Sequence, residues 1–157
     1  MGVLELRSIM ELLDRTKIHY TVSEHEPVYT SKQAAKVRGV ELKTGVKALV
    51  LRTREGGFVM GLVAADRRID LEKLAEIVGT KSLELASPKD VLETTGCEVG
   101  AVHPFGNLHG LPTYVDVSVL ENESVNFNAG LRTVSIQMKA KDLVKAIGPV
   151  IDEFSRR

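Results

Sequence analysis

The chain has 157 residues, of which 43% are hydrophobic and 27% are charged, a balance typical of one soluble globular domain, here residues 1–157. Its formal net charge is zero, which argues against a protein that coats nucleic acid through bulk positive charge. Cys97 is the only cysteine, which excludes an intrachain disulfide and a zinc site built from thiolates.

The N-terminal part predicts a helix, a short strand and a second helix. Apolar residues recur at helical spacing over 3–15, and acidic residues interrupt them, so this segment is an amphipathic helix rather than a signal peptide. No segment reaches the ~20 apolar residues of a bilayer span, and we expect a cytoplasmic protein. Residues 19–30 predict a short strand followed by a segment without regular secondary structure. Thr30 or Ser31 then caps a helix over 31–38.

The middle of the chain predicts a β-hairpin and two capped helices. Residues 46–53 and 57–65 are rich in β-branched residues and are separated by a short turn, as in a hairpin through the middle of a sheet. Asp70 caps a helix over 71–78, which a glycine closes. Ser87 starts another helix, with proline at its first position.

The last third predicts mostly strands, followed by closing helices. Strands are expected over 98–103, 113–120, 125–127 and 133–138, and helices over 140–147 and roughly 150–156. Strands joined by short turns and interrupted by helices favour an α+β domain with a mixed, mostly antiparallel sheet. Alternating βαβ units are absent from this pattern.

Lys47 is the first residue with a potential chemical role. It opens a strongly apolar strand, where its neighbours would confine it and direct its ammonium into a pocket. There it could meet a carbonyl or phosphate oxygen as a compact cation. The alternative is a lysine at a strand end that extends to water.

Two later segments contain candidate binding groups. Gly100–Pro104 can present consecutive backbone N–H groups to an ester carbonyl, as an oxyanion hole does, or can be a plain turn. Asn126–Gly130 is a strand end and small-residue turn whose amides could bind a substrate amine or a water, or only tolerate left-handed geometry. His103, inside the first segment, could position a water or contact a ribose.

Other chemistry is disfavoured. The histidines lack the spacing of metal ligands, so we expect neither a metal nor a cofactor. The G-x-S-x-G motif is absent and Cys97 has no evident histidine partner, which disfavours covalent catalysis. Residues 31–54 hold seven Lys or Arg against one acid, either a solvated surface or a local basic face for a few phosphates of an RNA end.

Seven segments in this order resemble the YbaK/prolyl-tRNA synthetase-associated domain family. They are EHEPVYT, VKALVL, DLEKLAEIVG, LASPKDVLETTGCEVGAVHPFG, LPTYVD, NFNAG and AKDLVKAI, and together they span nearly the whole chain. The resemblance implies a barrel-like sheet with flanking helices. It also implies a free-standing hydrolase that acts in trans and removes a misattached amino acid from the terminal adenosine of a tRNA, usually a proline tRNA.

The resemblance assigns roles to residues of this chain. Lys47 matches the family's characteristic lysine, Gly100 and Pro104 match the ends of its G-x-x-x-P loop, and 128–130 matches a small turn that lines the pocket. We therefore expect Lys47 and Gly100 to be catalytic. The residues expected to bind substrate are Ala101, Val102, His103, Pro104, Asn128, Ala129 and Gly130.

The turn reads Asn-Ala-Gly rather than the Ser-Gly-Gly of the cysteine-removing branch, so alanine is the first expected amino acid, ahead of serine, threonine and cysteine. The expected partner is the acceptor end of a mischarged tRNA, with prolyl-tRNA synthetase or an elongation factor helping to identify the tRNA. Neither membrane nor DNA is expected. A non-catalytic module that binds tRNA or a synthetase, and an unrelated small-molecule hydrolase, are the alternatives.

Overall fold

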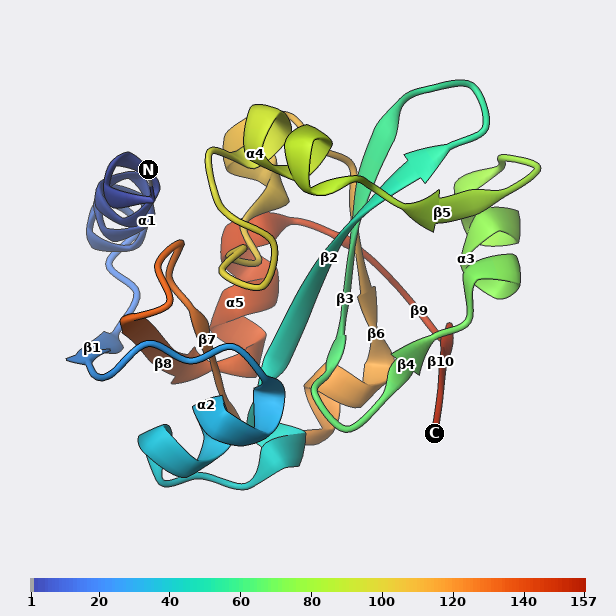
Figure 1. Ribbon diagram of the computed structural model, residues 1–157. Coiled ribbons are helices and arrows are strands. Elements are labelled where there is room, and N and C mark those ends of the chain that lie inside the picture. Colours follow the sequence, from blue (N-terminus) through green and yellow to red (C-terminus); the bar gives the residue numbers. More distant parts are fainter. Residues whose placement is uncertain (1) are drawn as a thin grey trace.

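A five-stranded mixed sheet forms the centre of the molecule (Figure 1) in the computed structural model, which describes residues 2–157. The strand order is β5-β2-β3-β6-β9, and β2 pairs antiparallel with β3 and β5, whereas β6 lies parallel to both β3 and β9. The strands are β5 (Leu83–Leu85), β2 (Val46–Thr53), β3 (Phe58–Ala64), β6 (Thr113–Asp116) and β9 (Val150–Asp152). The expected hairpin through the sheet centre is confirmed.

A smaller antiparallel sheet lies beside the start of β2. Its order is β1-β8-β7, with β1 at Tyr20–Glu24, β7 at Ser124–Asn128 and β8 at Val134–Lys139. An isolated bridge between Gly45 and Asn126 links β7 to the residue before β2. The α+β class is confirmed, but the strands of residues 2–157 form separate sheets, so the barrel-like sheet is not closed.

The helices begin where the capping residues predict. Thr30, Asp70 and Ser87 each accept a hydrogen bond from the backbone N–H three residues later. The α-helices are α1 (Val3–Arg15), α2 (Ser31–Arg38), α3 (Leu71–Val78), α4 (Pro88–Thr95) and α5 (Ala140–Ile147). Short 3₁₀ helices occupy η1 (Leu42–Thr44), η2 (Gly106–His109) and η3 (Val117–Glu121).

The main core joins the two larger sheets to the helices α1 and α5. It is built from aliphatic side chains and two aromatic ones, Phe105 and Phe127, whose rings meet edge to face at 5.6 Å. A second cluster packs α3 against the other face of the central sheet. In the described range, every helix is too short or too polar to cross a bilayer.

Two sequence predictions about strands are wrong. Residues 98–103 form a turn and an irregular loop, because Gly100 has φ +86° and the Ala101 N–H bonds back to the Glu98 carbonyl at 2.9 Å. The strand expected over 113–120 ends at Asp116, after which the chain turns into η3.

The C-terminal segment is extended rather than helical. Residues 150–156 form β9 and β10 (Ser155–Arg156), and β10 pairs with β4 (Arg68–Ile69). The buried Asp116 carboxylate accepts the backbone N–H groups of Phe154 at 2.7 Å and Ser155 at 3.0 Å. Burial alone would raise the pKa of Asp116, but these bonds and those from Ser118 lower it. These tertiary bonds replace the intrahelical bonds that a helix would have made.

Candidate functional site

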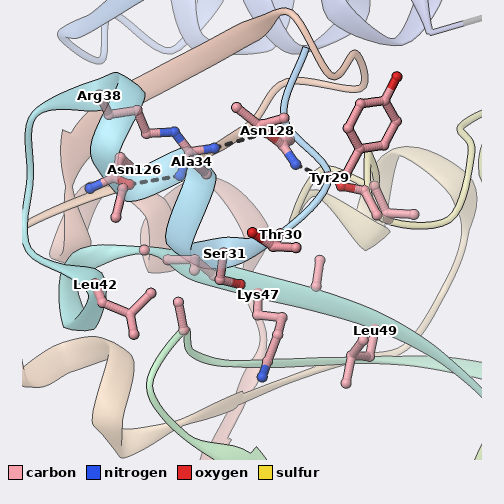
Figure 2. A pocket seen from close by; sticks show the side chains of 18 of the residues that line it. Tyr29, Thr30, Ser31, Ala34, Arg38, Leu42, Lys47, Leu49, Asn126 and Asn128 are labelled. Carbon is pink, nitrogen blue, oxygen red and sulfur yellow. Dashed lines mark hydrogen bonds between the residues drawn. The ribbon is translucent and has the colours of Figure 1, made fainter.

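A cavity of about 240 Å³ lies where α2, the start of β2, the end of β7 and the loop after α4 meet (Figure 2). This volume is slightly below the ~300–1,000 Å³ of typical drug-sized sites, so the cavity suits a small group. The described residues that line it include no Asp or Glu. They are Val28, Tyr29, Thr30, Ser31, Ala34, Ala35, Arg38, Leu42, Gly45, Val46, Lys47, Ala48, Leu49, Ala65, Val99, Gly100, Val102, Asn126 and Asn128.

Lys47 lines this cavity from the start of β2. Its side chain is half-buried, and its Nζ donates a hydrogen bond to the Arg67 carbonyl at 2.8 Å, which leaves two N–H groups for a ligand. Burial lowers the pKa of Lys47, nearby Arg68 lowers it further, and Asp66 opposes the shift. The lysine is therefore held at the cavity rather than extended into bulk water.

The loop after α4 presents two backbone donors at the cavity. Gly100 and Val102 line it, and their N–H groups have no hydrogen-bond partner among residues 2–157. The Ala101 N–H between them is already bonded to Glu98. This arrangement restricts the available donors of the expected oxyanion hole to alternate residues of the loop.

Five of the expected substrate-binding residues lie outside this cavity. His103 and Pro104 are buried behind the loop, and Ala129 is fully buried in the main core. Ala101 and Gly130 line a second hollow, which shares Tyr29 with the cavity. Of the expected residues, the cavity therefore gathers Lys47, Gly100, Val102 and Asn128, and the others support its wall.

His103 belongs to a buried hydrogen-bonded pair. The Phe105 N–H donates to its Nδ1 at 3.0 Å, so the ring proton is on Nε2, which donates to Nε2 of His109 at 2.8 Å. Burial, with a contribution from His109, lowers the pKa of His103 to about 3. The ring is therefore neutral at physiological pH, and it is buried in this structure, bonded to the Phe105 N–H and to His109.

This histidine predicts a specific acid sensitivity. The unfolded chain protonates His103 near pH 6.5 and the folded protein near pH 3, so its contribution is complete above pH 6.5 and declines as the pH falls between these values. Urea unfolding should show a loss of about 2 kcal/mol from this group between pH 7 and pH 5. His103→Asn should lose less over that interval. An identical pH slope in His103→Asn would contradict this assignment.

Arg38 is the site residue that the sequence analysis missed. Its guanidinium donates to Ser135 Oγ at 2.7 Å, Asn126 Oδ1 at 2.9 Å and Asn128 Oδ1 at 2.8 Å, as Figure 2 shows for the two asparagines. No carboxylate of residues 2–157 pairs with it, and burial lowers the pKa of Arg38 to about 10. It is still a cation at neutral pH, with two further N–H groups.

The bonds of Arg38 set the orientation of both asparagine amides. Because their oxygens accept from Arg38, their nitrogens donate elsewhere, from Asn126 to Thr44 Oγ1 at 2.8 Å and from Asn128 to the Gly100 carbonyl at 2.7 Å. Arg38 is thereby connected to the loop that presents the two free N–H groups. Its only signal in the sequence was its place in the basic segment 31–54.

The electrostatics favour a ligand rich in oxygen. Lys47 and Arg38 supply two positive charges, the loop supplies two N–H donors, and no carboxylate on the lining competes for them. Because the site is partly enclosed, these charges and donors interact with carbonyl, oxyanion or phosphate oxygens more strongly than they would in bulk water. None of the described lining residues is a histidine, cysteine or acid that could serve as a nucleophile or a strong general base.

Comparisons with known proteins indicate the family of this chain. A family profile described as the aminoacyl-tRNA editing domain matches residues 25–146. The chain is 32% identical to the multifunctional Ser/Thr-tRNA deacylase ProXp-y of Escherichia coli, over 99% of this chain and 95% of that protein. It is 30% identical to the prolyl-tRNA editing protein ProX of Acetoanaerobium sticklandii, over 90% of this chain and 89% of that protein.

The fold is shared with a solved structure described as a candidate trans-editing enzyme for prolyl tRNA synthetase. The two superpose with a TM-score of 0.86, with 29% sequence identity over 98% of each chain. Sequence, fold and the profile match over most of the chain lead to the same family. The chain belongs to the aminoacyl-tRNA editing domain family.

Proposed function

We propose that this protein is a trans-acting aminoacyl-tRNA deacylase of the cytoplasm, which hydrolyses the ester between a small amino acid and a tRNA, with a proline tRNA as the expected carrier. One observation carries the proposal: Lys47, Gly100 and Val102 line a single small cavity, and the N–H groups of Gly100 and Val102 have no hydrogen-bond partner among residues 2–157. The named relatives are deacylases or editing proteins, which supports the same reaction class.

The reaction needs little help from the protein because an aminoacyl ester is already activated. Water adds to the ester carbonyl carbon, and the Gly100 and Val102 N–H groups stabilise the oxyanion that forms. Collapse of this intermediate breaks the bond to the ribose oxygen, which takes up a proton as it leaves. Since none of residues 2–157 that line the cavity is an acid or a histidine, the substrate's own ribose hydroxyl or amine accepts the proton of the attacking water. Lys47 anchors the ester or phosphate end.

The lining also bears on which amino acid is removed. Beside apolar residues such as Val28 and Ala34, the wall offers the hydroxyl of Ser31 and that of Thr30, which accepts the Gln33 N–H and can still donate its own proton. A site with polar groups favours a substrate hydroxyl, because a substrate without it leaves those groups unpaired. We therefore place serine and threonine ahead of alanine, the first expectation from sequence. The Escherichia coli relative, by name a Ser/Thr-tRNA deacylase, supports this order.

A panel of mischarged proline tRNAs tests both the reaction and the order. We expect release of the amino acid from Ser-tRNA or Thr-tRNA, with kcat/KM about 10-fold above that for Ala-tRNA, the effect of one or two hydrogen bonds. Correctly charged Pro-tRNA is the control and should remain intact. Faster release of alanine would reverse the order, and tight binding without any release would contradict the deacylase.

A non-catalytic binding module is less well supported. Closure of the cavity by His103 or Phe105 would have favoured such a module, but both side chains are buried and neither lines the cavity. We propose that the chain contacts the acceptor end of the tRNA, while prolyl-tRNA synthetase or an elongation factor supplies recognition of the rest of the tRNA.

A further inference from the structure

Arg132 bonds to the loop after α4 from the second hollow, outside the lining of the cavity. It lies in the turn between β7 and β8, and its side chain is 21% exposed. The guanidinium donates from Nη2 to the Val99 carbonyl, lies 3.5 Å from the Glu98 carboxylate through Nε, and stacks 4.7 Å from the centre of the Tyr29 ring. It lines the second hollow and not the cavity that contains Lys47.

The bond to Val99 determines where the Gly100 N–H points. Val99 C=O and Gly100 N–H belong to one peptide unit, and residues 2–157 contain no cis peptide bond. In a planar trans unit the carbonyl and the N–H point in opposite directions. When Arg132 holds the Val99 oxygen, the Gly100 N–H is directed away from Arg132, and Gly100 lines a cavity whose lining does not include Arg132.

The next peptide unit is fixed in the same manner. The Gly100 carbonyl accepts from Asn128 Nδ2 at 2.7 Å, and the Ala101 N–H bonds to the Glu98 carbonyl at 2.9 Å. Gly100 itself is in the left-handed region, with φ +86°, and a Cβ added there would lie 3.0 Å from Arg132 Nη1. Side chains from β7 and from the β7–β8 turn thus hold both peptide units of a flexible glycine.

We propose that Arg132 is a positioning residue for deacylation, which aims the Gly100 N–H at the oxyanion through the Val99 carbonyl. The inference rests on the proposed function and goes beyond it, since Arg132 does not line the cavity. The ion pair with the exposed Glu98 explains little of this arrangement, because such surface pairs contribute weakly. The role depends on the guanidinium–carbonyl bond.

The test compares Arg132→Met with the parent on the best substrate of the panel. Loss of one oxyanion donor costs about 10²–10³ in rate, and a donor that is only misdirected should cost about 10–10²-fold in kcat, with KM changed less than about threefold. Arg132→Lys, which can still donate to Val99, should recover part of kcat. Arg54→Met removes an exposed arginine on the β2–β3 hairpin and should leave both constants unchanged.

A second readout does not depend on activity. In amide proton–nitrogen correlation spectra, the Gly100 signal should shift in Arg132→Met and partly return in Arg132→Lys, while signals in α3 remain in place and report an intact fold. Unchanged kcat or an unmoved Gly100 signal in Arg132→Met overturns the positioning role. If the parent releases no amino acid from any tRNA, the proposed function fails, and the Gly100 signal still decides whether Arg132 orients this peptide.

Discussion

Replacing Lys47 with alanine is expected to reduce single-turnover hydrolysis of the mischarged tRNA by about 10²–10³-fold, the usual effect of removing one charged or oxyanion-stabilising donor from an active site. Lys47 is half-buried, and among residues 2–157 its ammonium makes one hydrogen bond, to the Arg67 carbonyl. The thermal midpoint should therefore change by only a few degrees. Hydrolysis is measured by release of labelled amino acid, and folding by a melting curve.

Lys43→Ala is the matched control for this substitution. Lys43 also belongs to the basic segment, but its side chain is 58% exposed and its nearest acid is Glu41 at 3.8 Å. It should leave hydrolysis within about twofold of the parent, because an exposed charge contributes little. Equal losses in the two variants would mean that bulk positive charge, rather than a placed ammonium, explains the effect. Undiminished turnover in Lys47→Ala would remove the basis of the proposed mechanism.

Arg38→Met is expected to lower both stability and activity. Three oxygens, those of Ser135, Asn126 and Asn128, would lose the donor that they share, which should reduce the free energy of unfolding by about 2–4 kcal/mol. Asn128 would also be free to turn its amide away from the Gly100 carbonyl, so hydrolysis should fall by at least about 10-fold. Urea unfolding and hydrolysis at a temperature well below the melting transition measure the two effects.

Lys36→Met provides the comparison, since Lys36 is an exposed cation on the same helix α2. Its stability and activity should stay close to those of the parent. The informative quantity is activity per folded molecule. If folded Arg38→Met hydrolyses the ester as fast as the parent, then Arg38 stabilises the fold without organising the site.

Local sequence signals determined most of the elements of this fold. The helices α1 to α5 were predictable because their apolar spacing and their caps, Thr30, Asp70 and Ser87, act within a few residues. The β2–β3 hairpin was predictable from two apolar runs around a short turn. Lys47 could be singled out because it is a charged residue that opens a strongly apolar strand. Gly100 could be singled out because it begins a segment that can present backbone N–H groups.

Only the tertiary structure decided the rest, because the deciding contacts join residues far apart in the chain. The C-terminal segment is extended since Asp116 binds the N–H groups of Phe154 and Ser155, 38 and 39 residues away. Arg38 became a site residue through bonds to partners 88 to 97 residues away. Helical spacing and caps report local free energies, whereas a guanidinium's partners depend on which strands meet it after folding.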